Sequence, residues 1–140
     1  MIRIMQAADL TAVAEIWLDT NLSAHNFIPA GYWRDHFEQV RQMLPLAEVY
    51  VYEDQGEIQG FIGLDGSYIA GIFVCRQAQS RGIGGQLLEH VKARKDRLEL
   101  RVYQKNARAM AFYRREQFQI QGEGTDGGTG EKEYLMAWEA

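Results

Sequence analysis

The stretch from Ser67 to Leu88 constrains the fold most, because its apolar period changes at a cluster of glycines. Residues 69–74 form a β-branched and aromatic run that is typical of a buried strand. From Ile83 onward, apolar residues recur at every third or fourth position, which predicts a helix with one buried face. The residues from Gln79 to Gly85 separate the two patterns. The stretch therefore predicts a strand, a glycine-rich loop and a helix.

A glycine-rich entry to a helix is a candidate anion site. Glycine lets a ligand approach the backbone closely, and the unpaired N–H groups of the first turn, together with the helix dipole, favour a phosphate. Arg81 adds a positive charge. A glycine-rich turn that binds nothing is the alternative. Two phosphate motifs are excluded, because Gly84-Gly85-Gln86 lacks the Lys-Ser/Thr of a P-loop and Leu87 replaces the third glycine of the dinucleotide fingerprint.

Composition narrows the class of protein. A chain of 140 residues predicts one domain, residues 1–140, and a net charge of −4 argues against a dedicated nucleic-acid binder. Cys75 is the only cysteine, so no internal disulfide is possible, and no Cys/His cluster predicts a metal site. The chain shows neither a signal peptide nor an apolar run that could span a membrane. We therefore expect a cytoplasmic protein without metal that does not bind membranes.

The remaining pattern predicts an α/β fold with a mixed sheet between helices. Asp9 is the expected cap of the first helix, and residues 21–31 are expected to form a loop because they mix polar and aromatic residues with Pro29 and Gly31. Strands are expected at residues 1–5, 48–53, 57–64, 69–74, 98–102, 118–122 and 133–138. Helices are expected at residues 10–21, from 32 to near 45, from 83 onward, and at 106–117. The strand after the glycine loop's helix is expected to run parallel to the strand before the loop.

Two segments resemble motifs of the GNAT N-acetyltransferase superfamily. Gln79-Ser80-Arg81-Gly82-Ile83-Gly84 is similar to the signature Gln/Arg-x-x-Gly-x-Gly/Ala, which holds the coenzyme A pyrophosphate in that family. The segment from Val102 to Tyr113 is similar to the pattern V-x-x-x-N-x-x-A-x-x-F-Y. The resemblance implies the GNAT fold, with about six or seven strands and about four helices.

The resemblance also implies acetyl-CoA as the co-substrate and direct transfer of the acetyl group to a primary amine. Backbone groups at Phe73 and Val74 would align the thioester, Asn106 would bind the pantetheine region, and Tyr113 would be the general acid for the departing thiolate. The pyrophosphate would lie on the loop residues Gln79, Ser80, Arg81, Gly82, Ile83, Gly84 and Gly85.

The sequence gives fewer indications for the site of the amine acceptor than for the site of acetyl-CoA. Phe27, Tyr32 and Tyr103 are the expected aromatic walls, and His25 is a candidate base or acceptor contact because the ordinary pKa of histidine suits proton transfer. Glu57 and Asp65 are alternatives that could relay a proton. The acceptor could be a protein lysine, an N-terminal amine or a small amine.

Several alternatives stay open at this point. A catalytically silent acetyl-CoA-binding sensor would share both motifs, and the protein could be a monomer or a homodimer. A covalent acetyl-Cys75 is disfavoured, because no histidine is near it in the sequence. The chain departs from the family pattern at Arg76, where proline is common, and at Gln117, where glycine would end the helix without steric cost.

Overall fold

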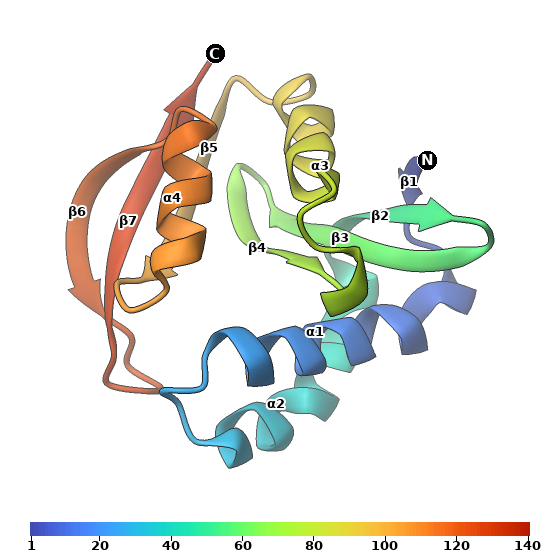
Figure 1. Cartoon of the computed structure of the whole chain (residues 1–140), viewed down its shortest axis with the longest axis horizontal. Coiled ribbons are helices and arrows are strands. Elements are labelled where there is room, and N and C mark those ends of the chain that lie inside the picture. Colours follow the sequence, from blue (N-terminus) through green and yellow to red (C-terminus); the bar gives the residue numbers. More distant parts are fainter.

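The computed structural model describes all 140 residues as a seven-stranded sheet with helices on both faces (Figure 1). The strands are β1 (Ile2–Ile4), β2 (Glu48–Asp54), β3 (Glu57–Asp65), β4 (Tyr68–Val74), β5 (Arg97–Tyr103), β6 (Gln119–Thr125) and β7 (Lys132–Glu139). The helices are α1 (Leu10–Ala24), α2 (Ala30–Met43), α3 (Ile83–Lys92) and α4 (Ala107–Arg115). The predicted number of strands and helices is confirmed.

The sheet order is β1-β2-β3-β4-β5-β7-β6. Every neighbouring pair is antiparallel except β4 and β5, which are parallel and are connected through α3. A parallel pair needs such a crossover, because the chain must return to the same end of the sheet. The predicted mixed sheet and the parallel strand after the glycine loop are therefore confirmed.

Two apolar cores hold the helices on the sheet. On one face, α1 contributes Val13 to a cluster with Val51 of β2 and Phe61 of β3. On the other face, Leu87 of α3 packs in a larger cluster with Ile62, the next residue of β3, and with residues of β5 and α4. Successive strand residues point to opposite faces, so one strand supplies both cores. This burial fixes the helices relative to the strand ends that they cover.

The sheet opens between β4 and β5, and this opening organises the rest of the molecule (Figure 1). The two strands pair only at Tyr68 with Glu99 and at Ile69 with Leu100. The next residue, Ala70, is skipped in the pairing with β3, where Gly71 pairs with Gly63 and Ile69 with Leu64. A bulge bends and twists its strand, which turns β4 away from β5. From Gly71 to the end of β4, the edge of this strand that faces β5 therefore has no strand partner.

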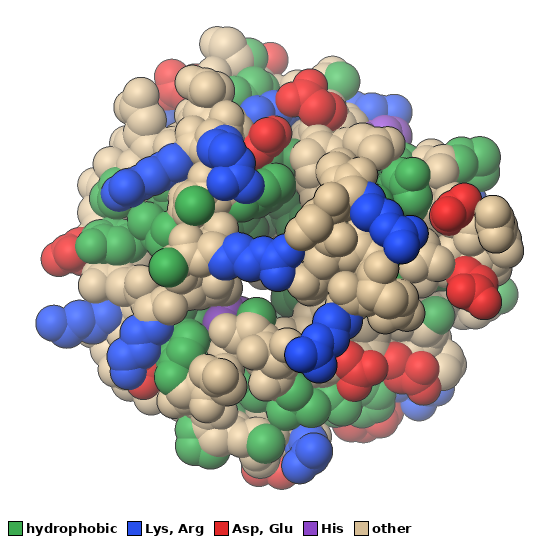
Figure 2. Space-filling view, viewed as in Figure 1, with side chains coloured by type: hydrophobic (Ala, Val, Ile, Leu, Met, Phe, Trp, Pro, Cys, Tyr) green, Lys and Arg blue, Asp and Glu red, His purple; other side chains and the backbone are tan.

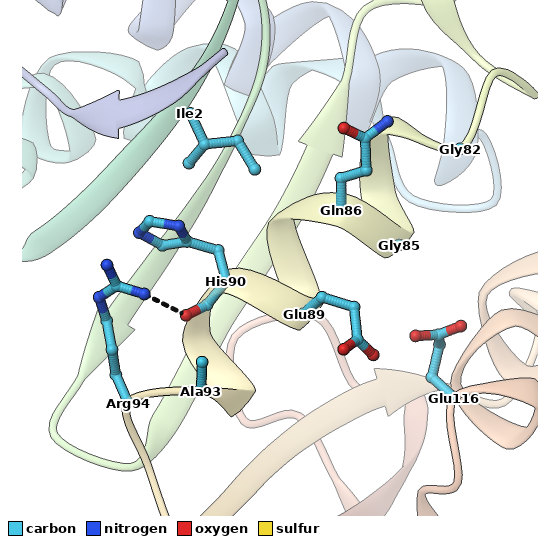
Figure 3. Close-up of a pocket in the computed structure, with 9 residues that line it drawn as sticks. All are labelled: Ile2, Gly82, Gly85, Gln86, Glu89, His90, Ala93, Arg94 and Glu116. Atoms are coloured by element: carbon cyan, nitrogen blue, oxygen red, sulfur yellow. Dashed lines mark hydrogen bonds between the residues drawn. The ribbon is translucent and has the colours of Figure 1, made fainter.

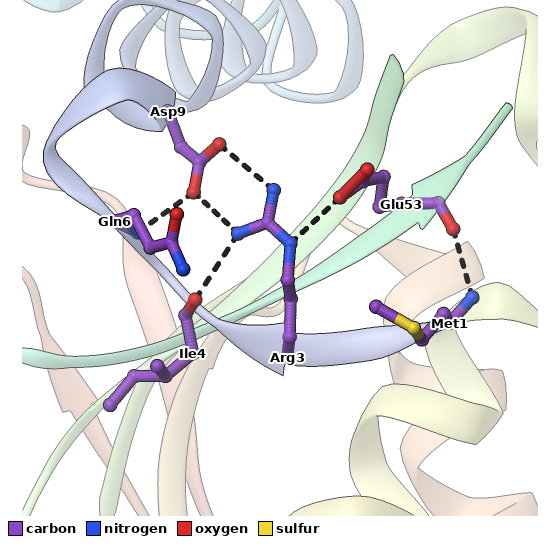
Figure 4. A network of polar contacts seen from close by, with 6 residues as sticks. All are labelled: Met1, Arg3, Ile4, Gln6, Asp9 and Glu53. Atoms are coloured by element: carbon purple, nitrogen blue, oxygen red, sulfur yellow. Dashed lines mark hydrogen bonds and ion pairs between the residues drawn. The ribbon is translucent and has the colours of Figure 1, made fainter. Parts of the chain in front are cut away.

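A polar network fastens the N-terminal strand to the edge of the sheet (Figure 4). The Arg3 guanidinium donates to the two carboxylate oxygens of Asp9 at 2.7 and 3.0 Å and to Oε2 of Glu53 at 2.7 Å. Asp9 also accepts from the Gln6 backbone N–H at 2.7 Å. Asp9 thus precedes α1, but its carboxylate does not cap that helix as predicted, because Arg3 and Gln6 occupy it.

The loop predicted at residues 21–31 is shorter than expected. Helix α1 continues to Ala24, and α2 begins at Ala30, directly after Pro29. The extra turn of α1 is closed by Asn21, whose carbonyl accepts from the His25 N–H at 2.9 Å and whose Oδ1 lies 2.8 Å from Nδ1 of His25. His25, expected within a loop, is therefore the residue that ends α1. Strand β6 likewise extends to Thr125, further than predicted.

Candidate active site

The glycine-rich loop joins the end of β4 to α3. Gly82 precedes the helix with a φ of 80°, in the left-handed region that glycine adopts without steric cost, and Ser80 also has a positive φ of 65°. The first helical bond runs from the Gln86 N–H to the Gly82 carbonyl at 3.0 Å. The N–H groups of Ile83, Gly84 and Gly85 consequently have no partner within the helix. The predicted strand, loop and helix are confirmed, with free amide donors at the start of α3.

The three glycines of this loop face different surroundings. A Cβ on Gly84 would lie 3.4 Å from the Phe112 ring of α4, so this glycine lets two helices approach closely. A Cβ on Gly82 or Gly85 would meet no atom within 4 Å. The loop is therefore open to a ligand at Gly82 and Gly85 and closed against α4 at Gly84.

A second cation, which the sequence analysis did not identify, reaches this loop from α4. Arg108 donates to Oε1 of Gln79 at 2.7 Å and to the Ser80 hydroxyl at 3.3 Å. Gln79 in turn donates to the Val74 carbonyl at 3.0 Å, which ties the loop to the end of β4. Only the position of Arg108, two residues after Asn106, could have signalled it. Arg81 and Arg108 together make the loop electropositive, as an anion site requires.

Figure 2 shows that the molecule is hollowed between α4, the end of β4 and α1, and that Lys and Arg side chains surround this hollow. Phe73 is the last residue but one of β4. The Phe73 ring packs on Phe61, with 4.9 Å between ring centroids, and lies so close over Gly71 that a Cβ there would be 2.4 Å from the ring. Phe73 and Val74 thus place their backbone, rather than their side chains, along the unpaired edge of β4.

Tyr113 lies on α4 with its ring in the core on the α3 and α4 face. It is 8% exposed and packs edge-on against Phe112 and Phe118. Burial raises the pKa of Tyr113 well above its ordinary value of 10, and the neighbouring Tyr68 raises it further. The phenol is therefore protonated at neutral pH, as a proton donor must be.

Asn106 and His25 are in direct contact although they are far apart in the chain. Asn106 caps α4 by accepting from the Ala109 N–H at 3.1 Å, and its Nδ2 lies 3.0 Å from Nε2 of His25. The other ring nitrogen of His25, Nδ1, lies 2.8 Å from Oδ1 of Asn21. Burial lowers the pKa of His25 to about 4. Both nitrogens are thus engaged, and the ring is neutral at physiological pH.

Two of the three predicted acceptor-wall aromatics, Phe27 and Tyr103, lie beside His25. Its ring lies 5.7 Å from that of Phe27 and 5.0 Å from that of Tyr103, and Tyr32 follows on the first turn of α2. The Tyr103 hydroxyl donates to Asp126 at 2.5 Å, in the loop between β6 and β7. Burial, followed by Asp126 and Glu133, raises the pKa of Tyr32. Asp126 lies in a glycine-rich segment without any motif, so the sequence offered no signal for it.

The remaining predicted candidates lie in different places. Asp65 pairs with Tyr68 at the far end of β4, away from the glycine loop. Glu57 lines a cavity of about 460 Å³ between α1 and the segment that begins at Cys75. The Cys75 thiol donates to Gln59 Oε1 at 3.2 Å, and burial raises its pKa. A protonated thiol is a poor nucleophile, which agrees with direct transfer rather than an acetyl-cysteine.

An open groove of about 640 Å³ follows the outer side of α3 (Figure 3). Gly82 and Gly85 lie at the end where the helix begins, and Arg94, at the other end, donates to the His90 carbonyl at 2.7 Å. Glu89 and Glu116 face its middle. Because these carboxylates repel an anion, only the end next to the glycine loop suits a phosphate.

The parallel strands that separate beside an electropositive helix start define an acyl-CoA-dependent transferase of the GNAT type. A sequence model described as an acetyltransferase (GNAT) domain matches residues 45–120. The chain is 38% identical to peptidyl-lysine N-acetyltransferase YiaC of Escherichia coli (strain K12) over 140 residues, covering 99% of this chain and 96% of YiaC. The chain therefore belongs to the GNAT acetyltransferases.

The fold is shared with solved members of the family. The apo form of YjaB from Escherichia coli superimposes with a TM-score of 0.87 at 25% identity, covering 99% of this chain and 96% of YjaB. A PaiA N-acetyltransferase from Thermoplasma acidophilum in complex with coenzyme A gives a TM-score of 0.83 at 15% identity, covering 100% and 98% of the two chains, which shows a common fold. These relatives are transferases, and none supports the alternative of a silent sensor. No helix of the structure combines the length and the apolarity needed to cross a bilayer.

Proposed function

We propose that this protein transfers the acetyl group of acetyl-CoA to the side-chain amine of a lysine in a peptide or protein. The observation that carries the proposal is the unpaired edge of β4, which leads from the gap beside β5 to the free amides at the start of α3. A pantetheine arm needs an extended edge of backbone, and a pyrophosphate needs amide donors and cations. The lysine acceptor is supported by the activity that gives the YiaC relative its name.

The residues at the loop suit the pyrophosphate. The amides from Ser80 to Gly85 would donate to it, and Arg81 and Arg108 would balance its charge. Backbone groups at Phe73 and Val74 would align the thioester beside the gap. Asn106 has a second N–H on Nδ2, beyond the one facing His25, that can donate to the pantetheine region.

The reaction would proceed by direct attack. The neutral lysine nitrogen, reaching the gap past Phe27, Tyr32 and Tyr103, adds to the thioester carbonyl carbon, and the proton of the resulting ammonium passes to solvent water. Collapse of the tetrahedral intermediate breaks the carbon–sulfur bond, and the Tyr113 hydroxyl protonates the departing thiolate. The amide product and free coenzyme A leave. The acidic groups Asp126 and Glu133 near Tyr32 would attract the cationic lysine to the acceptor side.

A thiol-release assay with acetyl-CoA tests the proposal. The acceptors are an Nα-blocked peptide with one lysine, the same peptide with arginine in place of lysine, a peptide with a free N-terminus and no lysine, and a set of small amines. We expect release with the lysine peptide alone and a single acetyl group on its lysine by mass spectrometry. Acetyl-CoA binding without release above background would instead identify a sensor. Release with small amines alone, or with the N-terminal amine alone, would refute the lysine assignment.

A further inference from the structure

A chain of hydrogen bonds joins the end of α1 to the start of α4. Asn21 on the last turn of α1 contacts Nδ1 of His25 at 2.8 Å, and Nε2 of His25 contacts Asn106 at the start of α4 at 3.0 Å. His25 and Asn106 are 81 residues apart. The side of the site that carries the acceptor wall is thereby joined to the helix that carries Tyr113.

Hydrogen bonds to the backbone fix the orientation of both amide side chains, and these in turn fix the tautomer of His25. Asn106 Oδ1 accepts from the Ala109 N–H at 3.1 Å, so the amide nitrogen must face His25 and donate to Nε2. The proton of the neutral ring is then on Nδ1, which donates to Asn21 Oδ1. The Asn21 amide nitrogen, finally, donates to the Trp17 carbonyl at 2.8 Å. Each donor meets an acceptor only if His25 is the neutral Nδ1–H tautomer.

The surroundings of the ring keep it neutral. The rings of Phe27, Trp33 and Tyr103 lie 5.7, 5.5 and 5.0 Å from it. The nearby titratable groups are Tyr103, from β5, and Lys105, whose ammonium lies 5.5 Å from the centre of the Phe27 ring. Asn21 and Asn106 are uncharged. No carboxylate contacts the ring, so nothing offsets the cost of charging it within this aromatic shell.

We propose that His25 is a positioning residue, a neutral clasp that joins the end of α1 to the Asn106 cap of α4 across the amine entrance. The clasp holds the Asn106 amide with its second N–H free for the cofactor, and it fixes the distance between the acceptor wall and Tyr113. The inference rests on the proposed function for its catalytic consequence, but the clasp itself exists without any substrate. This positioning role replaces the general-base role considered for His25. Both ring nitrogens are already hydrogen-bonded, and a base with so low a pKa has little tendency to take a proton at neutral pH.

Two variants separate the clasp from a general base. His25→Phe keeps an aromatic ring in the shell and removes both hydrogen bonds. His25→Gln offers an amide oxygen where Nε2 lies and can still accept from Asn106. If His25 is a clasp, His25→Phe should lower kcat/KM for the lysine peptide by about ten-fold, as expected when remote contacts misplace the reacting groups, and His25→Gln should recover most of that loss. His90→Phe, on the outer side of α3, is the matched control and should retain the parent rate.

The pH profile and NMR spectra complete the test. A clasp leaves the shape of the kcat/KM profile between pH 6 and 9 the same in the parent and both variants. The ¹⁵N spectrum of the parent without ligand should show the Nδ1–H tautomer of His25 and no titration above pH 5, and the Asn106 side-chain amide signal should shift in His25→Phe.

The clasp is overturned if the Nε2–H tautomer is found, if the ring titrates near neutral pH, or if both variants lose activity equally together with the acidic limb of the profile. Because the spectra need no acceptor, failure of the lysine assignment would leave this part of the test intact.

Discussion

Replacing Tyr113 by phenylalanine separates catalysis from folding at one position. The ring packs against Phe112 and Phe118 at centroid distances of 5.2 and 5.6 Å, and phenylalanine keeps these contacts. The hydroxyl makes no hydrogen bond within the protein, so its removal should change the free energy of unfolding by less than about 1 kcal/mol. Loss of a general acid lowers a rate by about 10²-fold or more, which raises the barrier by about 2.7 kcal/mol.

The assay follows thiol release at saturating peptide and varied acetyl-CoA. We expect kcat of Tyr113→Phe to fall by about 100-fold while KM for acetyl-CoA changes by less than about three-fold, because the proton transfer is made only in the transition state. Tyr68→Phe is the matched control, since this phenol neighbours Tyr113 without a proposed role. A folded Tyr113→Phe variant with the parent kcat would refute the assignment of the acid.

Three further predictions concern stability. Gln117 ends α4 with a φ of 73°, so Gln117→Gly should raise the free energy of unfolding by about 0.5–1 kcal/mol in urea titrations; a decrease would contradict the inferred backbone strain. A Cβ at Gly71 would lie 2.4 Å from the Phe73 ring, so Gly71→Ala should lower that free energy by about 1–3 kcal/mol, and an unchanged melting curve would show that the ring moves freely. Burial lowers the pKa of His25 from 6.5 to about 4, so the unfolded chain binds the extra proton first. Stability should be full above about pH 6.5 and fall toward pH 4 by about 2 kcal/mol, less than the fully buried limit of about 3 because the ring is partly exposed, and His25→Phe should remove this slope.

Gln117 departs from the family pattern at the end of α4, and its backbone conformation shows the physical consequence. Glycine is common at this position in the family, and the chain keeps the same backbone with glutamine. The Phe118 N–H bonds to the Tyr113 carbonyl at 2.9 Å and the Gln117 N–H to the Arg114 carbonyl at 3.1 Å, the pattern of a helix end that requires a left-handed residue. The two possibilities that the sequence left open, strain or a different helix end, are thus resolved in favour of strain.

The local sequence pattern was sufficient to predict those strands, helices and loops that depend on residues close together in the sequence. The alternation of residues 48–53 predicted a strand, the spacing from Ile83 predicted a helix, and the glycines before it predicted a loop with free amides. The C-terminal limit of α1 was missed, because its last turn is closed by contacts between Asn21 and His25, which polar composition alone does not reveal. The shorter loop then placed His25 at a helix end.

The sequence by itself determined the order of elements and the glycine loop, because periodicity and short motifs are encoded within a few residues. Its family resemblance predicted roles for Asn106 and Tyr113. Only the tertiary structure decided which distant groups meet. It brought Arg108 to the glycine loop and joined His25 to Asn106 across 81 residues. It also opened β4 from β5 through the skipped Ala70. Such contacts depend on how the two apolar cores pack on opposite faces of the sheet. Many residues share the same apolar pattern, so the pattern does not specify which residues come into contact.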